Sequence, residues 1–164
     1  MGERFGSFLS ARDDVLARVV AALRPLDLRV ALTTGSADTR RWGPLPGHWL
    51  VREHLPQVAV LDRAALAVSH GGNNSVTEAL NRGVPLLVLP FSTDQFAAAA
   101  AIERAALGAA LDPNTATVAA LRGAATTVLH GNATASAREL GAELRARPGR
   151  HIARSALLHA TPAR

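Results

Sequence analysis

The chain has 164 residues, a formal net charge of +5 and no cysteine, and 48% of its residues are hydrophobic. This length suits one domain with a substantial core, and the absence of cysteine excludes disulfides and thiolate metal sites. The basic residues are all arginine and are scattered without interleaved aromatic side chains, which argues against a nucleic-acid surface. The sequence contains no long apolar run and no signal-peptide pattern, so we expect no membrane span and a cytoplasmic location.

Short apolar strands alternate with helices along the chain, a pattern typical of a parallel sheet covered by helices on both faces. In chain order, the sequence predicts a helix over 10–24, a strand over 28–34, a loop over 35–47, a strand over 48–51, a helix over 56–63, a strand over 66–69, a helix over 74–82, a strand over 86–89, a helix over 93–107, a strand over 109–111 and helices over 115–130, 134–147 and 152–159. We therefore predict an α/β, Rossmann-like doubly wound parallel sheet over residues 1–147, followed by a C-terminal helix and tail over residues 148–164.

The start of the chain departs from this pattern. A doubly wound domain normally opens with a full apolar strand, but here only residues 4–7 precede the first predicted helix. We therefore expect the first strand to be truncated or very short.

The sequence HGGNNS at residues 70–75 directly follows a predicted strand and opens a predicted helix that carries Glu78. Glycines at this place leave backbone N–H groups free to face an anion at the helix N-terminus. A carboxylate one turn further along accepts hydrogen bonds from ribose hydroxyls. Separately, each of these residues would more often be a turn residue or a solvated side chain. Their joint spacing predicts a site for a phosphate-bearing nucleotide.

Residues 54–95 resemble the donor-binding signature of GT-B glycosyltransferases that use nucleotide sugars. The resemblance is closest to the UDP-glycosyltransferase and macrolide glycosyltransferase group. The signature consists of Pro-Gln, His-x-Gly-x-Asn-Ser, Glu, Gly-Val-Pro and Asp-Gln in that order. This chain carries these pieces at residues 56–57, 70–75, 78, 83–85 and 94–95. The resemblance covers nearly the whole chain but only the C-terminal half of such an enzyme.

The resemblance implies a set of residues that bind the nucleotide-sugar donor. They are Ser7, His70, Gly72, Asn73, Asn74 and Ser75 around the diphosphate, Gln57 and Glu78 at the ribose, His54 and Leu55 at the base, and Asp94 and Gln95 at the sugar hydroxyls. Similar enzymes need no metal and no cofactor beyond the donor, and the resemblance assigns no catalytic residue to this part of the enzyme.

The implied function is the donor-binding domain of an inverting glycosyltransferase that moves a hexose from a UDP- or dTDP-sugar to a small-molecule acceptor. In this group the general base belongs to the N-terminal acceptor domain. We therefore expect this chain to bind the donor but to be inactive without that missing domain or a partner subunit. Two alternatives stay open: the donor-binding subunit of a two-subunit N-acetylglucosaminyltransferase, and a non-catalytic nucleotide-binding remnant. A homodimer through residues 148–164 is a further hypothesis.

Overall fold

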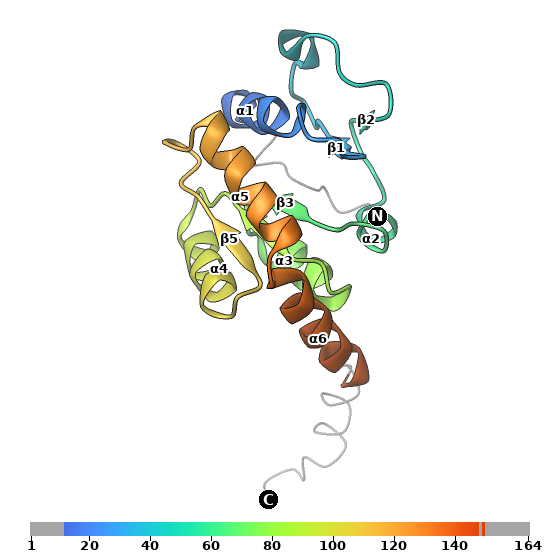
Figure 1. Cartoon of the computed structure of the whole chain (residues 1–164), viewed down its shortest axis with the longest axis vertical. Coiled ribbons are helices and arrows are strands. Elements are labelled where there is room, and N and C mark those ends of the chain that lie inside the picture. The colour runs from blue at the N-terminus through green and yellow to red at the C-terminus, as the bar shows by residue number, and fades with distance from the viewer. Residues whose placement is uncertain (1–11, 148, 150–164) are drawn as a thin grey trace, which may run out of the picture.

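Helices and parallel strands alternate in the computed structural model of the protein, which describes residues 12–147 and residue 149 (Figure 1). The elements are α1 (Asp13–Leu23), β1 (Ala31–Thr33), the 3₁₀ helix η1 (Thr39–Trp42), β2 (Leu50–Arg52), α2 (Gln57–Leu61), β3 (Ala67–Ser69), α3 (Asn73–Asn81), β4 (Leu86–Val88), α4 (Thr93–Arg104), β5 (Gly108–Ala110), α5 (Val118–His130) and α6 (Ala133–Ala146). The predicted α/β class with parallel strands is confirmed. The predictions of a short first strand and of a helix over 152–159 lie outside the described residues.

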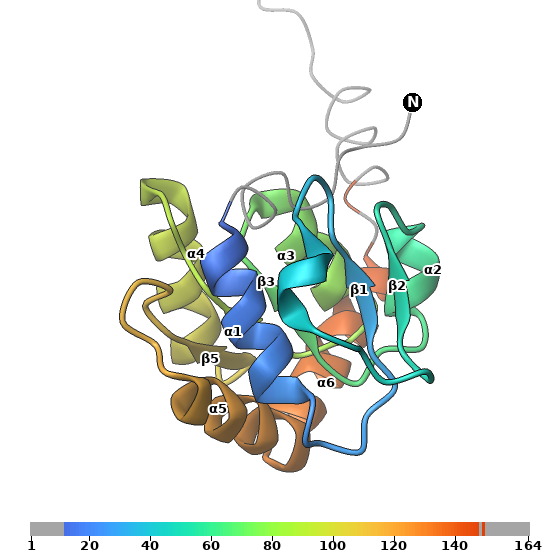
Figure 2. The same ribbon diagram turned by 90° about the horizontal axis from the view of Figure 1, so that it is seen from above.

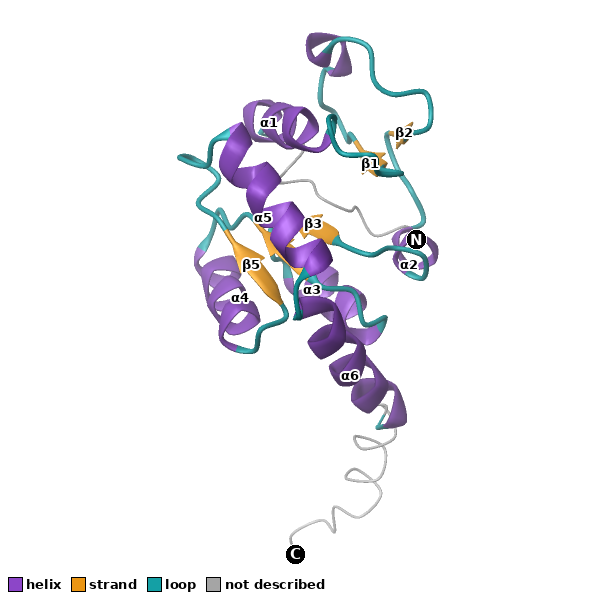
Figure 3. Cartoon of the chain, in the orientation of Figure 1, coloured by secondary structure: helices purple, strands orange, loops and turns teal. Residues whose placement is uncertain are grey.

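The strands form two separate groups (Figure 3). In one group β1 pairs with β2, and in the other β4 lies between β3 and β5. All of these pairings are parallel, with Ala31 opposite Leu50, Ala67 opposite Leu86, and Leu86 opposite Gly108. Among residues 12–147 no strand lies between β1 and β3, so the described strands form two sheets.

Helices cover both faces of β4, which explains its continuous apolar sequence. Leu87 and the following Leu89 pack in one cluster with apolar residues of α1 and α5. Leu86 and Val88 point to the other face, into a cluster with residues of α3, α4 and α6. Figure 2 shows α1 between the β1–β2 pair and α4. The domain is thus doubly wound, as predicted.

Arginine side chains tie α1 to the α5 region, about a hundred residues away in the sequence. Arg18 donates hydrogen bonds to the carbonyl oxygens of Ala116 (2.6 Å) and Pro113 (2.7 Å). Arg122 donates through Nε to the carbonyl oxygen of Ala22 (3.2 Å). These contacts join the first described helix to the C-terminal part of the fold.

Several element boundaries differ from the prediction, among them the strand predicted over 28–34, which is observed only over Ala31–Thr33. Local hydrogen bonds explain two of the differences. The predicted loop contains η1, because the Asp38 carboxylate accepts from the Arg40 N–H at 3.2 Å and caps a 3₁₀ turn. The helix predicted from residue 115 begins at Val118, because the Thr117 hydroxyl accepts from the Ala120 N–H at 3.1 Å. None of the helices among the described residues combines the length and apolar character that a membrane crossing requires.

Candidate functional site

A sharp turn joins β3 to α3 and presents the N-terminus of this helix at the carboxyl end of the strand. The buried Ser69 hydroxyl accepts from the Gly71 N–H at 3.2 Å. Gly71 has a φ of +86°, so it makes the left-handed turn, whereas Gly72 is the extended N-cap residue. No side chain caps α3, and the N–H groups of a first helical turn have no acceptor within the helix itself.

The His70 imidazole lies against the start of α3. A Cβ atom on Gly72 would collide with His70 Nε2 and lie 3.1 Å from His70 Cε1, so only glycine leaves room for the ring in this position. His70 is half-buried. Burial lowers the pKa of His70 below its ordinary value of 6.5, and the Asp94 carboxylate opposes this by raising it. The ring is therefore neutral at pH 7 and offers one N–H donor beside the helix N-terminus.

The environment of His70 predicts how its imidazole titrates with pH. We expect the NMR titration of the His70 Cε1–H resonance to have its midpoint below 6.5. Asp94→Asn should lower the midpoint further, because the substitution removes the charge that raises it. Since the unfolded chain binds this proton more readily, stability should fall as the pH drops below about 6.5. A midpoint at or above 6.5, or an upward shift in Asp94→Asn, would contradict this account.

The two residues assigned to the ribose lie in contact. Gln57, the first residue of α2, donates through Nε2 to Glu78 Oε2 on α3 at 2.8 Å. Among the described residues, only Gln57 bonds to the Glu78 carboxylate, so its other oxygen, Oε1, keeps acceptor capacity. The contact fixes α2 against α3 at the mouth of the site, which the sequence pattern alone did not reveal.

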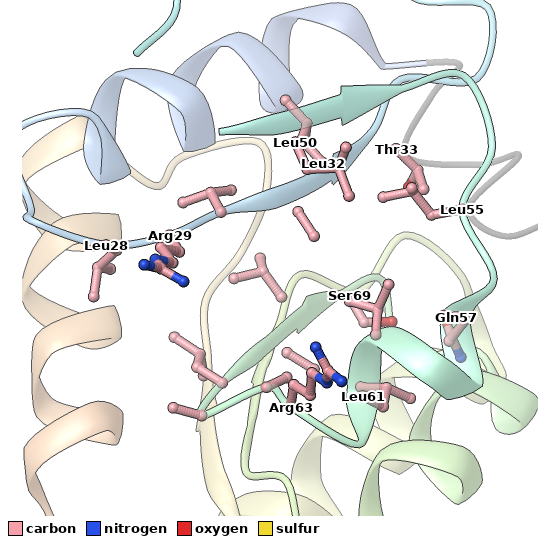
Figure 4. Close-up of a pocket in the computed structure, with 18 of the residues that line it drawn as sticks. Leu28, Arg29, Leu32, Thr33, Leu50, Leu55, Gln57, Leu61, Arg63 and Ser69 are labelled. Atoms are coloured by element: carbon pink, nitrogen blue, oxygen red, sulfur yellow. The ribbon is translucent and has the colours of Figure 1, made fainter. Parts of the chain in front are cut away.

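Several of the predicted residues border one cavity of about 1040 Å³ (Figure 4). Leu55 and Gln57 line it from the segment entering α2, and His70 and Ser75 line it from the β3–α3 turn. Ser75 is buried, whereas Asn73 and Asn74 are exposed on the first turn of α3. The structure therefore brings the predicted diphosphate and ribose residues to one place.

His54, assigned to the base, and Asp94, assigned to the sugar, are not among the residues that line this cavity. The His54 side chain is exposed and lies 3.8 Å from the Glu53 carboxylate, measured from Nδ1 to Oε1. Asp94 is exposed on the first turn of α4, where the Ser92 hydroxyl donates to it at 2.8 Å and lowers its pKa. Ser7 lies outside the described residues.

Gln95 has a structural contact that sequence reasoning missed. It is buried, and its Oε1 accepts from the Phe91 N–H at 2.8 Å. The side chain thus shapes the loop between β4 and α4, which places Asp94 near His70. No sequence signal distinguishes this role, because a glutamine that binds a sugar and one that closes a loop look alike.

Comparisons with known proteins agree on one family. Residues 17–155 match the model of the family described as erythromycin biosynthesis protein CIII-like, C-terminal domain. The chain belongs to this family. Among curated members of the wider group, the NDP-glycosyltransferase YjiC of Bacillus subtilis (strain 168) is 32% identical over 118 residues, which are 71% of this chain and 30% of the relative. The demethyllactenocin mycarosyltransferase of Streptomyces fradiae is 34% identical over 76% of this chain and 27% of the relative.

Solved glycosyltransferase structures resemble this erythromycin CIII-like domain over most of its length. The kitacinnamycin glycotransferase superimposes with a TM-score of 0.75 and 32% identity, covering 92% of this chain and 41% of that chain. The glycosyltransferase VinC, solved in complex with dTDP, gives a TM-score of 0.76 and 26% identity over 85% of this chain and 36% of its own. The domain thus has the fold of the C-terminal half of a GT-B glycosyltransferase, and it spans well under half the length of these relatives.

Proposed function

We propose that the chain is the donor-binding domain of an inverting glycosyltransferase that uses a UDP- or dTDP-sugar to glycosylate a small-molecule acceptor. The observation that carries the proposal is the convergence of His70, the uncapped N-terminus of α3 and the Gln57–Glu78 pair at the carboxyl end of β3. Ligands of open parallel sheets bind at this end of the strands. The dTDP complex of VinC supports the choice of a nucleoside diphosphate.

In this proposal the diphosphate lies against the first turn of α3. The helix dipole and the backbone N–H groups attract the anion. The His70 N–H donates to a phosphate oxygen, and the buried Ser75 hydroxyl and the Asn74 amide add further polar contacts on the same turn. Because Gln57 holds one Glu78 oxygen, the carboxylate keeps a fixed orientation toward the ribose hydroxyls.

The same groups would assist the reaction. As the glycosidic bond to the donor breaks, negative charge grows on the leaving diphosphate. Donors that are already oriented by the β3–α3 turn stabilise that charge without reorganising. Asp94 would accept a hydrogen bond from a sugar hydroxyl, and Gln95 would keep the Asp94 loop in place. His54 and Leu55 would pack against the base from the segment before α2.

Calorimetric titration of UDP and of dTDP into the chain tests the proposal. The parent should bind at least one of them. The double variant His70→Ala, Glu78→Ala should bind at least ~100-fold more weakly, because it loses two contacts with charged groups, each worth roughly 1.5–3 kcal/mol. A matched variant, His130→Ala with Glu143→Ala, removes the same residue types from exposed positions on α5 and α6. It should bind like the parent. Absence of binding to both nucleotides, or equal loss in both double variants, would overturn the proposal.

Catalysis is expected to need the acceptor-binding half of the enzyme. Inversion requires a base that takes the proton of the acceptor hydroxyl. The resemblance assigns that base to the other domain. Incubation of the chain with UDP-glucose or dTDP-glucose and phenolic acceptors should therefore give no glycoside by mass spectrometry. Clear transfer by this chain would contradict the expectation.

A further inference from the structure

The short helix α2 makes two side-chain contacts with α3, one at each of its ends; Figure 4 labels Gln57 and Leu61 on it. Gln57, its first residue, bonds to Glu78 as described above. Asp62, its C-cap residue, lies against Arg82, with 3.0 Å between Asp62 Oδ1 and Arg82 Nε. Glu78 and Arg82 are four residues apart, so they lie on one face of α3 and hold α2 at two points.

The partners of the second contact differ in exposure. Arg82 Nε is buried and, among the described residues, makes no hydrogen bond, so Asp62 compensates its charge through an ion pair alone. The Arg82 side chain is 29% exposed, against 58% for Asp62. Within the same part of the chain Arg82 has no other ion-pair partner. Loss of the Asp62 charge would therefore leave a partly buried cation without a counter-ion, which is costly.

The orientation of α2 depends on few contacts. The helix has five residues, too few for a helix to be stable by itself in water. Leu61 is its one buried residue, and it belongs to the same apolar cluster as Ala79 of α3. Leu61 and the two polar contacts therefore determine how α2 lies on α3.

We propose that Arg82 is a positioning residue for the nucleoside part of the donor, a role that rests on the proposed function. By holding Asp62, Arg82 keeps the C-terminal end of α2 on α3. The other end of α2 carries Gln57, which orients Glu78, and the segment before it carries residues 54–55. The diphosphate contacts lie on the β3–α3 turn instead. Loss of the ion pair should therefore disturb the nucleoside contacts and leave the diphosphate contacts in place.

A purely local effect of Asp62 on α2 predicts the opposite result. A carboxylate at the C-terminal end of a helix is repelled by the partial negative charge of the last carbonyl groups. If Asp62 acted only in this way, Asp62→Asn would stabilise α2. If Asp62 acts through Arg82, the same substitution releases the end of α2, and the amides of this helix exchange faster with solvent.

Hydrogen exchange of the full chain, followed by NMR without any nucleotide, tests the structural part. The Val60 amide is hydrogen-bonded in the first turn of α2. It should exchange about fivefold faster in both Asp62→Asn and Arg82→Met, the upper end of the effect of a partly exposed ion pair. Arg82→Lys keeps the charge and should retain most of the parent's protection. A control variant, Arg40→Met, removes the ion pair of Arg40 with Asp38 next to η1 and should exchange like the parent.

Calorimetric titration of UDP and dTDP tests the functional part. Arg82→Met should bind whichever nucleotide the parent binds about fivefold more weakly, while the NMR titration midpoint of His70 stays that of the parent. A shifted His70 midpoint would mean that the substitution disturbs α3 as a whole. That result, unchanged nucleotide affinity or unchanged exchange of Val60 would overturn the positioning role and leave the proposed function standing. Absence of binding to the parent would overturn the proposed function itself, and the role of Arg82 with it.

Discussion

Gly108→Ala is expected to lower the free energy of unfolding by about 3 kcal/mol or more, the upper end of the usual cost of overpacking. Gly108 is the first residue of β5 and lies opposite Leu86 of the buried strand β4. A Cβ atom here would overlap the Leu86 carbonyl oxygen and lie 2.8 Å from its carbon and 2.9 Å from the Leu86 nitrogen. These are backbone atoms, so the overlap is removed only if β4 and β5 move apart. Urea unfolding followed by circular dichroism measures the change.

A glycine in a helix provides the matched control for Gly108. Gly123 lies in the middle of α5 and is exposed to solvent, and a Cβ atom built on it meets no atom within 4 Å. Gly123→Ala should therefore raise stability by about 0.5–1 kcal/mol, because alanine loses less backbone entropy in a helix. If the two substitutions had similar effects on stability, the close contact between β4 and β5 could not be the cause.

Gly71→Ala is expected both to destabilise the fold and to remove nucleotide binding. The positive φ of Gly71 costs a residue with a Cβ about 1–3 kcal/mol. In addition, the new Cβ would lie 2.7 Å from Val88 Cγ1 and 3.5 Å from the Gln95 carbonyl oxygen. The turn must therefore shift away from β4, and the shift would move both His70 and the first turn of α3. Urea unfolding and calorimetric titration with UDP measure the two effects.

Gly43→Ala separates backbone strain from displacement of the site. Gly43 has a φ of +67°, is exposed, and leaves a Cβ atom with no contact within 4 Å. This variant should lose stability through strain but keep the nucleotide affinity of the parent. If Gly71→Ala kept full nucleotide affinity, the β3–α3 turn would not determine the geometry of the nucleotide site.

The sequence predicted the parts of the fold that depend on local pattern. Continuous apolar runs marked β3 and β4, and the HGGNNS turn marked the start of α3 to within one residue. These features follow from neighbours in the chain, so a single sequence suffices to find them.

The parts that were missed depend on partners distant in the sequence. The assignment of Gln57 and Glu78 to the ribose did not include the hydrogen bond between them, which spans 21 residues. The structural contact of Gln95 with the Phe91 N–H depends on how the loop after β4 folds back. The order β3-β4-β5 and the separate β1-β2 pair among residues 12–147 are properties of strand arrangement in space, which periodicity does not encode.

The arginine contacts between α1 and α5 also determine when the domain can form during synthesis. Because Arg18 bonds to residues 113 and 116, and Arg122 bonds back to Ala22, α1 has no complete packing partner until α5 has left the ribosome. Such long-range contacts make loop closure slow. We expect a nascent chain that ends before α5 to leave the apolar face of α1 exposed, so that chaperone binding during translation would be concentrated on this helix.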